Sequence, residues 1–583
     1  MSFYNHETMS LAFKKQLPET HHGPLIKLGG GEVGGKARGL SFLAAQLGLF
    51  DVGPGFAPHR IIVPETTVIA TDEFNRFVHE NHLPAIVGEP DGVVVRRFLD
   101  TPLPSEVEAT LTRYALQHRG PIAVRSSSLS EDALDHPFAG VYLSYMLPNN
   151  ASQLPARVRQ LSQAIRAVWA QVLCRDPISY MRAHGVDNEQ ERMAVILQDV
   201  VGSRHDDVFY PTCSGVAQSY NFFPVGRQRA EEGVASIVLG LGKRAVDDDD
   251  ALRFSPASPT VRPAAARASD LLRAAQRAFY AVNMTSGEKE LTGSDMDTLA
   301  ELPVASAETH GTLDDLASTW VPEDQTVYEG VGRTGFRVLT FHRLLRGEVF
   351  PLPGLMMRLL KVFSDGFGRA VEVEFALTLD MHEGKRRGTF HLLQARPMGS
   401  LMAQSSVTMP EVPAERLVLT TSKSMGHQHL KNIRHLLYVA PDGFDQDVAH
   451  EAAREIARLN EELLRKHAPY VLLAPGRLGT RNAALGIPVT FPQVAGASAL
   501  VELSTPEFVT EPSQGTHFFH NMVSRGMPYL AVDTRAGDVL NRTWLDAQPR
   551  ETHGPVTHIM VDAPLEVRVV GTTQQGMVYQ KED

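Results

Sequence analysis

The sequence predicts an α/β protein with at least two domains, and three observations support this. Short apolar runs typical of buried strands alternate with amphipathic helical segments. The chain has 583 residues, which exceeds what one core usually organises and suggests about three or four domains. A polar stretch with two prolines covers 399–415 and resembles a linker. We therefore expect a first domain at 20–400, a linker at 401–415 and a smaller α/β region at 416–583.

The composition excludes several classes of protein. Hydrophobic residues make up 43% and charged residues 21% of the chain, as in ordinary globular domains. No apolar run reaches 18 residues and Met1–His22 is polar, so we expect a cytoplasmic protein without a membrane span or secretory signal. The two cysteines, Cys174 and Cys213, lie far apart without metal-type spacing, which excludes a disulfide scaffold and a cysteine-based zinc site. A net charge of −11 argues against a nucleic-acid partner on electrostatic grounds.

Periodicity predicts the order of elements in the first part of the chain. A glycine-rich loop leads into a helix over Ala37–Leu49. Residues 247–268, which contain four consecutive aspartates, predict a solvated excursion. The remaining expected strands lie at 60–64, 121–128, 193–201, 212–223 and 234–242, and the expected helices lie at 105–118 and 154–183.

The later elements include a hairpin and a second mixed region. Residues 371–379 and 389–395 alternate in the manner of strands, and a charged turn, HEGKRRG, joins them. Beyond the linker, 447–467 predicts a strongly amphipathic helix, and 485–535 predicts a mixed α/β segment.

The first motif with chemical meaning is GGGEVGGKARG. Gly30, Gly35 and Lys36 nearly satisfy the P-loop pattern G-x4-G-K-[ST], but Ala37 replaces the hydroxyl residue that binds Mg²⁺. The motif therefore indicates a glycine loop whose lysine reaches a nucleotide phosphate. A true P-loop and a plain glycine-rich turn are the alternatives.

The second motif is AVRSSSLSED, residues 123–132. Arg125 follows a predicted buried strand and precedes three serines, so a guanidinium and several hydroxyls could meet phosphate oxygens. A polar loop capped by serine is the alternative.

The third motif is the predicted hairpin. Glu372 and Glu374 share one face of their strand, and Gln394 and Arg396 share one face of the partner strand. Carboxylate and amide oxygens suit Mg²⁺, while an arginine suits phosphate. The alternative is a surface face with cross-strand ion pairs.

These motifs form part of a longer series. GGKARGL, AVRSSSLSEDALDHPFAGVYLSY, ILQDVV, SGVAQS, GLG and VEVEF…LLQARP occur in this order over about 360 residues. The series resembles the successive signatures of the ATP-binding domain of the phosphoenolpyruvate synthase and pyruvate phosphate dikinase family. The resemblance implies a two-lobed ATP-grasp domain that binds ATP and Mg²⁺.

The resemblance also implies roles for single residues. Lys36 and Arg125 match phosphate-contacting cations, and Arg125 is also a candidate catalytic residue. Gln198 falls on the strand that passes the adenine. The metal-coordinating pair of the family is matched by Glu374 and Gln394, and the arginine that follows it by Arg396.

Two positions depart from the family pattern. Glu372 stands where the family usually has aspartate, and Lys243 stands after GLG where the family usually has glutamate. Lys243 exchanges a carboxylate for a cation near the expected site, which bears on the number of metal ions and on nucleotide handling.

A fourth motif lies in the second part of the chain, at PSQGTHFFHNMVSRGMPYLAVD. His517, a short helix and Gly526-Met527-Pro528 resemble the phosphohistidine signature of the same enzymes, and ALVELSTPEFV before it resembles the strand–helix lead-in of their swivelling domain. His517 is therefore a candidate catalytic phosphate acceptor. The usual serine is missing and two phenylalanines replace small residues, so a degenerate structural domain and coincidence remain alternatives; His520 is expected to lie on a helix face.

Two further clusters favour simple interpretations. His427 and His429 lie two residues apart without further ligands, which favours a polar loop over a metal site. Asp247–Asp250 lacks the spacing and the closing glutamate of a Ca²⁺ loop.

The resemblance implies an ATP-dependent phosphotransferase that relays phosphate through a histidine to an unknown acceptor. The related enzymes end in a pyruvate-binding barrel, and a barrel needs roughly 250 residues, more than the segment after the linker provides. We therefore expect another acceptor or a partner chain. The rival hypotheses are a nucleotide-binding regulatory or structural module without turnover, and a P-loop nucleotidase.

Overall fold

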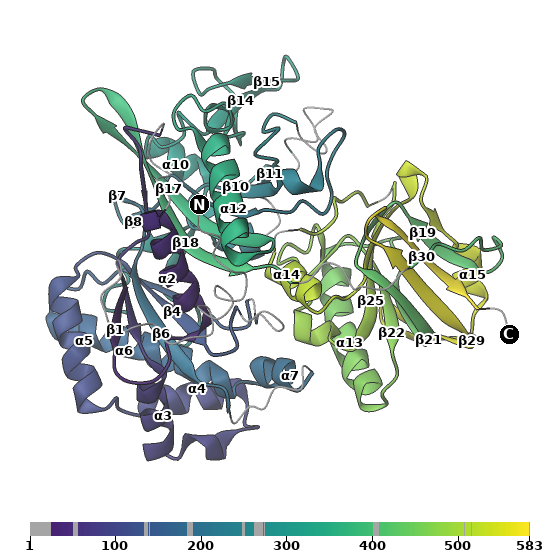
Figure 1. Ribbon diagram of the computed structural model, residues 1–583, viewed down its shortest axis with the longest axis horizontal. Coiled ribbons are helices and arrows are strands. Elements are labelled where there is room, and N and C mark those ends of the chain that lie inside the picture. The colour runs from purple at the N-terminus through teal and green to yellow at the C-terminus, as the bar shows by residue number, and fades with distance from the viewer. Residues whose placement is uncertain are drawn as a thin grey trace, which may run out of the picture. The chain divides into compact units, whose positions relative to one another are not determined.

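Figure 1 shows the computed structural model, in which the chain forms two compact units that divide between Pro397 and Met398. The structure describes residues 25–49, 56–132, 138, 140–183, 190–247, 251–261, 272, 275–399, 407–506, 508–514 and 516–581. The polar start Met1–His22, residues 401–406 of the expected linker and Asp248–Asp250 lie outside the described residues. None of the described helices is long and apolar enough to cross a membrane.

The first unit contains a five-stranded sheet in the order β1-β3-β6-β4-β5, which is antiparallel except for β1 and β3. Its strands are β1 (Leu25–Leu28), β3 (Thr66–Ile69), β6 (Met193–Asp199), β4 (Ile122–Ser128) and β5 (Tyr145–Leu147). Helices of this lobe bury aromatic side chains together, with Trp169 against Phe74 and Phe77. These helices are α3 (Thr71–Glu80), α4 (Asp91–Asp100), α5 (Ser105–Gln117), α6 (Leu154–Ala170) and α7 (Arg175–Ala183).

A second sheet of the first unit has six strands in the order β11-β10-β9-β17-β18-β2. They are β11 (Leu252–Phe254), β10 (Val234–Val238), β9 (Cys213–Gln218), β17 (Val371–His382), β18 (Lys385–Pro397) and β2 (Arg60–Ile62). The predicted hairpin is confirmed as β17 and β18, which turn at Glu383 and Gly384, both with positive φ.

Helix α2 (Gly34–Leu49) packs against both sheets (Figure 1). Its apolar residues Ala37, Leu40 and Leu43 join one core cluster with Ile196 of β6 and Leu392 of β18. A Cβ at Gly39 would collide with the carbonyl oxygen of Ala395, so glycine permits the close approach of α2 to β18. The two sheets therefore share one core around the helix that follows the glycine loop.

Smaller elements complete the first unit. A four-stranded sheet contains β7 (Ser203–His205), β8 (Val208–Tyr210), β12 (Ala278–Asn283) and β13 (Leu299–Pro303), and a three-stranded sheet contains β14 (Ala317–Val321), β15 (Thr326–Glu329) and β16 (Phe336–Leu339). The further helices are α8 (Lys243–Asp247), α10 (Val304–Thr309), α11 (His342–Leu345) and α12 (Leu352–Phe367).

Two expectations for the first unit are wrong in detail. The helix expected over 154–183 is interrupted, because Gln171–Leu173 forms a 3₁₀ turn and Cys174 adopts an extended conformation. The excursion expected over 247–268 contains the edge strand β11, whose Phe254 is 2% exposed. Sequence periodicity did not reveal this strand, because Leu252–Phe254 has only three residues and directly follows a run of aspartates.

The second unit is built on a ten-stranded sheet whose main path is β20-β26-β25-β22-β21-β29-β30-β19-β27, with β28 beside β29. The strands β21, β22, β25 and β26 are parallel, and the remaining pairs are antiparallel. The bounds are β19 (Leu417–Thr421), β20 (Lys423–Met425), β21 (His427–Val439), β22 (Tyr470–Pro475), β25 (Ala497–Ser504), β26 (Tyr529–Asp533), β27 (Val539–Leu540), β28 (Arg550–His553), β29 (Val556–Val570) and β30 (Gln575–Gln580).

Helices connect the parallel strands of the second unit. The predicted amphipathic helix is confirmed as α13 (Gln446–Arg465), which links β21 to β22, and Asp445 caps it by accepting from the amide of Val448. Helix α14 (His517–Ser524) links β25 to β26. The short pair β23 (Arg477–Leu478) and β24 (Gly486–Ile487) and helix α15 (Arg542–Ala547) complete the unit.

Candidate functional site

The glycine loop and the end of β4 meet at the start of α2. Gly34 has φ of 77°, and a Cβ at Gly35 would overlap the carbonyl oxygen of Glu131. The Ser127 hydroxyl donates to the carbonyl of Val33 (2.8 Å) and accepts from the amide of Ala37 (3.1 Å). Glycines at these positions therefore allow the first turn of α2 to lie directly on the segment that follows β4.

Lys36 belongs to this first turn. Its Nζ donates to Ser126 Oγ (2.9 Å) and forms an ion pair with Glu131. The Glu131 side chain is 1% exposed and also accepts from the Ser126 hydroxyl and the Ser128 amide (both 2.8 Å). The ammonium group is thus held at the end of β4 by a buried carboxylate that the sequence analysis did not single out, although Glu131 lies within the second motif.

Arg125 connects the two sheets of the first unit. It lies on β4, and its Nη1 donates to the carbonyl of Leu393 on β18 (2.9 Å). Its Nη2 donates to Glu374 Oε2 (3.0 Å) and to Gln394 Oε1 (2.7 Å). The strand-end arginine and the acidic–amide hairpin, about 250 residues apart in the sequence, therefore meet at one point.

Asp132 completes this polar cluster. Its Oδ2 accepts from Gln394 Nε2 (2.7 Å), and its Oδ1 lies 3.7 Å from Arg396 Nη1. Burial raises the pKa of the Asp132 carboxyl to about 6, although Arg396 and Lys36 oppose the change. Because both cations act on this carboxyl, Asp132 couples the glycine-loop side of the cluster to the hairpin side. No pattern in the sequence marked Asp132 as a site residue, although Asp132 closes the second motif.

The second pair of the hairpin is a buried ion pair. Glu372 lies opposite Arg396 in the register of β17 and β18, and the Arg396 Nε donates to Glu372 Oε1 (2.8 Å). Gln218 of β9 donates to the other carboxylate oxygen (2.7 Å). Glu372 and Arg396 are 1% and 2% exposed, so the alternative of a solvated surface face is excluded.

Gln198 lies on the sheet face that also carries Arg125. In the antiparallel register Gln198 is opposite Ala123 and Ile196 is opposite Arg125, so all four side chains share one face. Gln198 is 2% exposed and donates to Thr66 Oγ1 (2.9 Å). The predicted residue is therefore on the same side of the sheet as the polar cluster, with a structural partner of its own.

Lys243, which departs from the family pattern, begins helix α8 and forms an ion pair with Asp295. The two side chains are 15% and 14% exposed. A carboxylate 52 residues later in the chain therefore balances the added cation, a partner that no local pattern in the sequence indicated.

Glu374 and Gln394 fit a divalent cation by their oxygens. They are directly opposite in the hairpin. Arg125 Nη2 donates to an oxygen of each, at 3.0 Å for Glu374 and 2.7 Å for Gln394. The bond from Gln394 Nε2 to Asp132 turns the amide oxygen toward Glu374. A carboxylate and an amide oxygen that converge in this way are suitable ligands for Mg²⁺.

His517 is the first residue of α14 in the second unit. Thr516 caps the helix by accepting from the amide of Phe519 (3.2 Å), so His517 lies where helix amides and the dipole favour an anion. Phe518 and Phe519 are 7% and 0% exposed. The bulky residues that weakened the match therefore fill the core rather than the surface.

The surroundings of α14 follow the expected order of strand, histidine, helix and turn, with one correction. The described residues between Ser504 and Thr516 contain no helix, so ALVELSTPEFV supplies the strand β25 but not a helix directly after it. The helix ends at Ser524, and Gly526 in the following turn has φ of 62°. His520 is 1% exposed and belongs to the buried face of α14.

Of the two weaker clusters, the histidine pair at His427 and His429 lies on β21. His429 Nε2 donates to the Glu566 carboxylate (2.7 Å), which is a structural pairing. Among the described residues, a group with metal-like spacing occurs at Glu551, His553 and His558 instead.

Two sheets that share a core around a glycine-loop helix, with two cations and a carboxylate–amide pair converging between them, fit a nucleotide-binding domain. The chain belongs to the family of the pyruvate phosphate dikinase AMP/ATP-binding domain, whose model matches residues 31–416. The resemblance drawn from the six motifs and the mixed α/β fold class are thereby confirmed.

Named relatives share short parts of the chain at low identity. An uncharacterized phosphotransferase, YvkC, of Bacillus subtilis is 24% identical over 152 residues, 26% of this chain and 17% of its own length. A phosphoenolpyruvate synthase of Aeropyrum pernix is 25% identical over 202 residues, 30% of this chain and 22% of its length. A rifampicin phosphotransferase of Streptomyces sviceus is 28% identical over 199 residues, 31% of this chain and 21% of its length. The matched region thus spans about a fifth of each relative.

Proposed function

We propose that this protein is an ATP-dependent phosphotransferase that binds Mg-ATP in the first unit and relays phosphate through His517 to an acceptor not yet identified. The observation that carries the proposal is the convergence of Lys36, Arg125, Glu374 and Gln394, which come from three distant segments, into one polar cluster. Family membership over 31–416 supports nucleotide binding by this cluster.

Lys36 and Arg125 are the residues proposed to bind the phosphates. Their present partners are carboxylates and an amide, so a triphosphate would replace some of these contacts with phosphate oxygens. Arg396 is committed to the buried Glu372, and its part is to hold the hairpin and to add positive potential. Gln198 would lie beside the base. Precise positioning and charge neutralisation are the main contributions a protein makes to phosphoryl transfer.

Glu374 and Gln394 are the proposed ligands of Mg²⁺. The ion would bridge phosphate oxygens and neutralise charge that develops during transfer. Asp132 holds the Gln394 amide in the orientation that directs its oxygen toward Glu374. When the oxygens take a metal ion, the guanidinium of Arg125 becomes available to phosphate.

His517 is the proposed nucleophile. A ring nitrogen would attack the β-phosphorus of ATP, forming an N–P bond while the bond from that phosphorus to the bridging α,β oxygen breaks. The electron pair of the broken bond leaves with AMP, and the other ring nitrogen releases its proton to solvent. The amides at the start of α14 would stabilise the new phosphate charge. The histidine then carries a pyrophosphoryl group, and water would cleave the bond between its two phosphates and release the terminal one as inorganic phosphate. Transfer of the remaining phosphoryl group to the acceptor, with a proton returned to the ring, would regenerate neutral His517.

The test is incubation of the full chain with Mg²⁺ and ATP labelled at the β-phosphate. We expect acid-labile label on the protein and one AMP per label, both lost in His517→Ala and retained in His79→Ala, which alters an exposed histidine of α3. ATP binding without label or AMP would contradict the relay and favour a module without turnover. Steady release of ADP that depends on Lys36 but not on Glu374 would favour a P-loop nucleotidase.

A further inference from the structure

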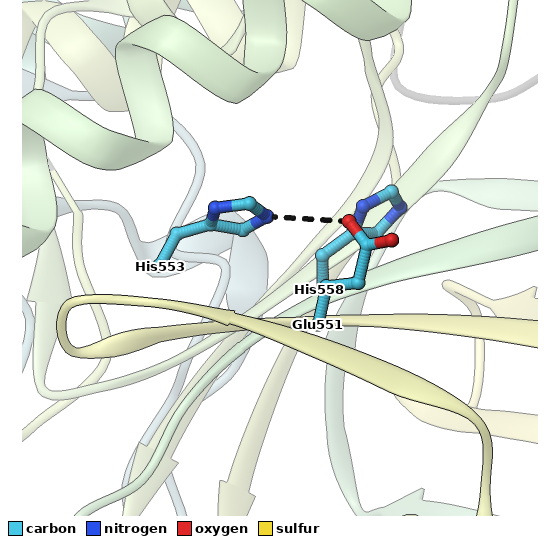
Figure 2. Close-up of side chains that lie close together, drawn as sticks. All are labelled: Glu551, His553 and His558. Carbon is cyan, nitrogen blue, oxygen red and sulfur yellow. Dashed lines mark ion pairs between the residues drawn. The ribbon is translucent and has the colours of Figure 1, made fainter.

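A cluster of three potential metal ligands lies on the hairpin of β28 and β29 in the second unit. Figure 2 shows Glu551, His553 and His558, with the ion pair between Glu551 and His553 dashed. Glu551 and His553 are two residues apart on β28 and share one face. His558 is directly opposite Glu551 in the register of the hairpin and so faces the same side. The hairpin therefore presents a carboxylate and two imidazoles together.

The ligand atoms are close to the spacing that a metal ion needs. One ligand atom from each residue lies within 4.8 Å of the other two, and His553 Nε2 is 3.7 Å from Glu551 Oε2. Ligand atoms around a tetrahedral Zn²⁺ with bonds of about 2.0–2.1 Å lie roughly 3.4 Å apart. The Glu551 and His553 side chains are 63% and 28% exposed, so small rotations could close the remaining gap.

A further histidine orients the cluster. His435 of β21 has its Nδ1 3.0 Å from His558 Nε2, so one of these rings donates a hydrogen bond to the other. A bond of this kind fixes the ring orientation of a metal-binding histidine and leaves its second nitrogen for the ion. His558 is 9% exposed, and both strands that hold the pair belong to the central part of the sheet.

We propose that Glu551, His553 and His558 bind a divalent transition-metal ion such as Zn²⁺, with His435 as a positioning residue. Two imidazoles and a carboxylate form a ligand set suited to Zn²⁺, which leaves a fourth position for water. Among the described residues, Glu551 has no lysine or arginine as an ion-pair partner, so its negative charge is available to the ion. The site is independent of the proposed phosphotransfer.

Binding would tie the β28–β29 turn to the rest of the sheet. The three ligands lie on a short hairpin, while His435 belongs to a neighbouring strand. An ion that binds the folded hairpin and not the unfolded chain stabilises the second unit.

The test is titration of the metal-free full chain with Zn²⁺ in competition with a chromophoric chelator. We expect one tight equivalent per chain, at least tenfold weaker binding in Glu551→Gln and in His553→Ala, and unchanged binding in the control His79→Ala. Zn²⁺ should also raise the thermal unfolding temperature of the wild type and not that of the double variant that combines Glu551→Gln with His553→Ala. Circular dichroism of each variant checks that the fold is retained.

Co²⁺ provides a spectroscopic test of the ligand set and of His435. The visible bands of the Co²⁺-loaded wild type should indicate tetrahedral nitrogen and oxygen coordination and should be lost in the double variant. His435→Phe should weaken Co²⁺ binding by about tenfold or more, and His435→Gln, which keeps a hydrogen-bonding group, should restore part of it. No tight equivalent, or binding unaffected by Glu551→Gln and His553→Ala, would overturn the proposal.

Discussion

The proposed phosphate-binding cluster of the first unit and the proposed acceptor of the second unit are built in opposite ways. Lys36 and Arg396 are held by buried carboxylates, and Arg125 by the partly buried Glu374, all from other segments of the chain. His517 begins a single capped helix, and its position depends on the local sequence around Thr516. In the first unit the same contacts would thus serve both the proposed function and stability. In the second unit we expect a substitution of the acceptor to leave the buried core of the helix in place.

Arg396→Met tests the first half of this comparison and has the largest expected effect. Removing the guanidinium leaves Glu372 and Asp132 buried without their cation, and breaking a buried ion pair costs about 3–5 kcal/mol. We expect a loss of this size in the free energy of unfolding of the first unit, measured by chemical denaturation.

The controls distinguish burial from charge. Arg96→Met removes a guanidinium that is 78% exposed and should change stability by less than about 0.5 kcal/mol. The double variant Glu372→Leu with Arg396→Met should recover much of the loss, because no unpaired buried charge remains at that pair. Equal effects of Arg396→Met and Arg96→Met would refute the assignment of a buried network.

Lys36→Ala tests whether the buried cluster of the first unit also serves phosphate transfer. The ammonium is the proposed phosphate contact in the first turn of α2, and loss of one such preorganised charge contact typically lowers turnover by roughly 100- to 1000-fold. We expect this loss in label transferred from ATP, together with some loss of stability because Glu131 stays buried. Lys361→Ala, at a side chain 76% exposed on α12, serves as the matched control and should transfer label normally.

His517→Asn sharpens the contrast between the units. Asn preserves the polarity at the start of α14 but offers no nucleophile, so label transfer should be lost while the free energy of unfolding falls by less than in Arg396→Met. ATP binding, measured by calorimetry, should stay unchanged. A large loss of stability in this variant would show that the histidine is a structural residue, as the degenerate-domain alternative requires.

Lys243→Met addresses the departure from the family pattern. The ion pair with Asp295 is partly buried, so its loss should cost roughly 1–2 kcal/mol, between an exposed and a buried pair. ATP affinity should be unchanged, because the ammonium already has its partner. Weaker ATP binding at unchanged stability would instead place Lys243 among the nucleotide contacts.

The sequence predicted those parts of the first unit that depend on local pattern. The shared face of Glu372 and Glu374, and that of Gln394 and Arg396, follow from the alternation of the two strands, and the motif order revealed the family. It could not predict which groups would pair across segments. Asp295 lies 52 residues from Lys243, and the meeting of Arg125 with Leu393 depends on how two sheets pack around α2.

The second unit shows a related limit. The helix α13 and the order of β25, α14 and β26 follow from periodicity and from the Gly526-Met527-Pro528 turn. The histidine cluster at Glu551, His553 and His558 did not appear in the sequence analysis. His435, which contacts it, lies 123 residues from His558, and strand pairing alone brings them together.

Asp132→Asn tests the link between the two sides of the polar cluster. Burial raises the pKa of Asp132 to about 6 from an ordinary value near 4. Between these values the folded protein holds a proton that the unfolded chain releases, so this carboxyl makes stability fall as pH rises, by at most about 1.4 kcal/mol per pH unit.

The asparagine side chain of the Asp132→Asn variant accepts from Gln394 but cannot titrate. The difference in unfolding free energy between Asp132→Asn and wild type should therefore shift in favour of the variant as pH rises from 4 to 7. A difference that stays constant with pH would mean that Asp132 is ionised throughout, and that the cations of the cluster outweigh its burial.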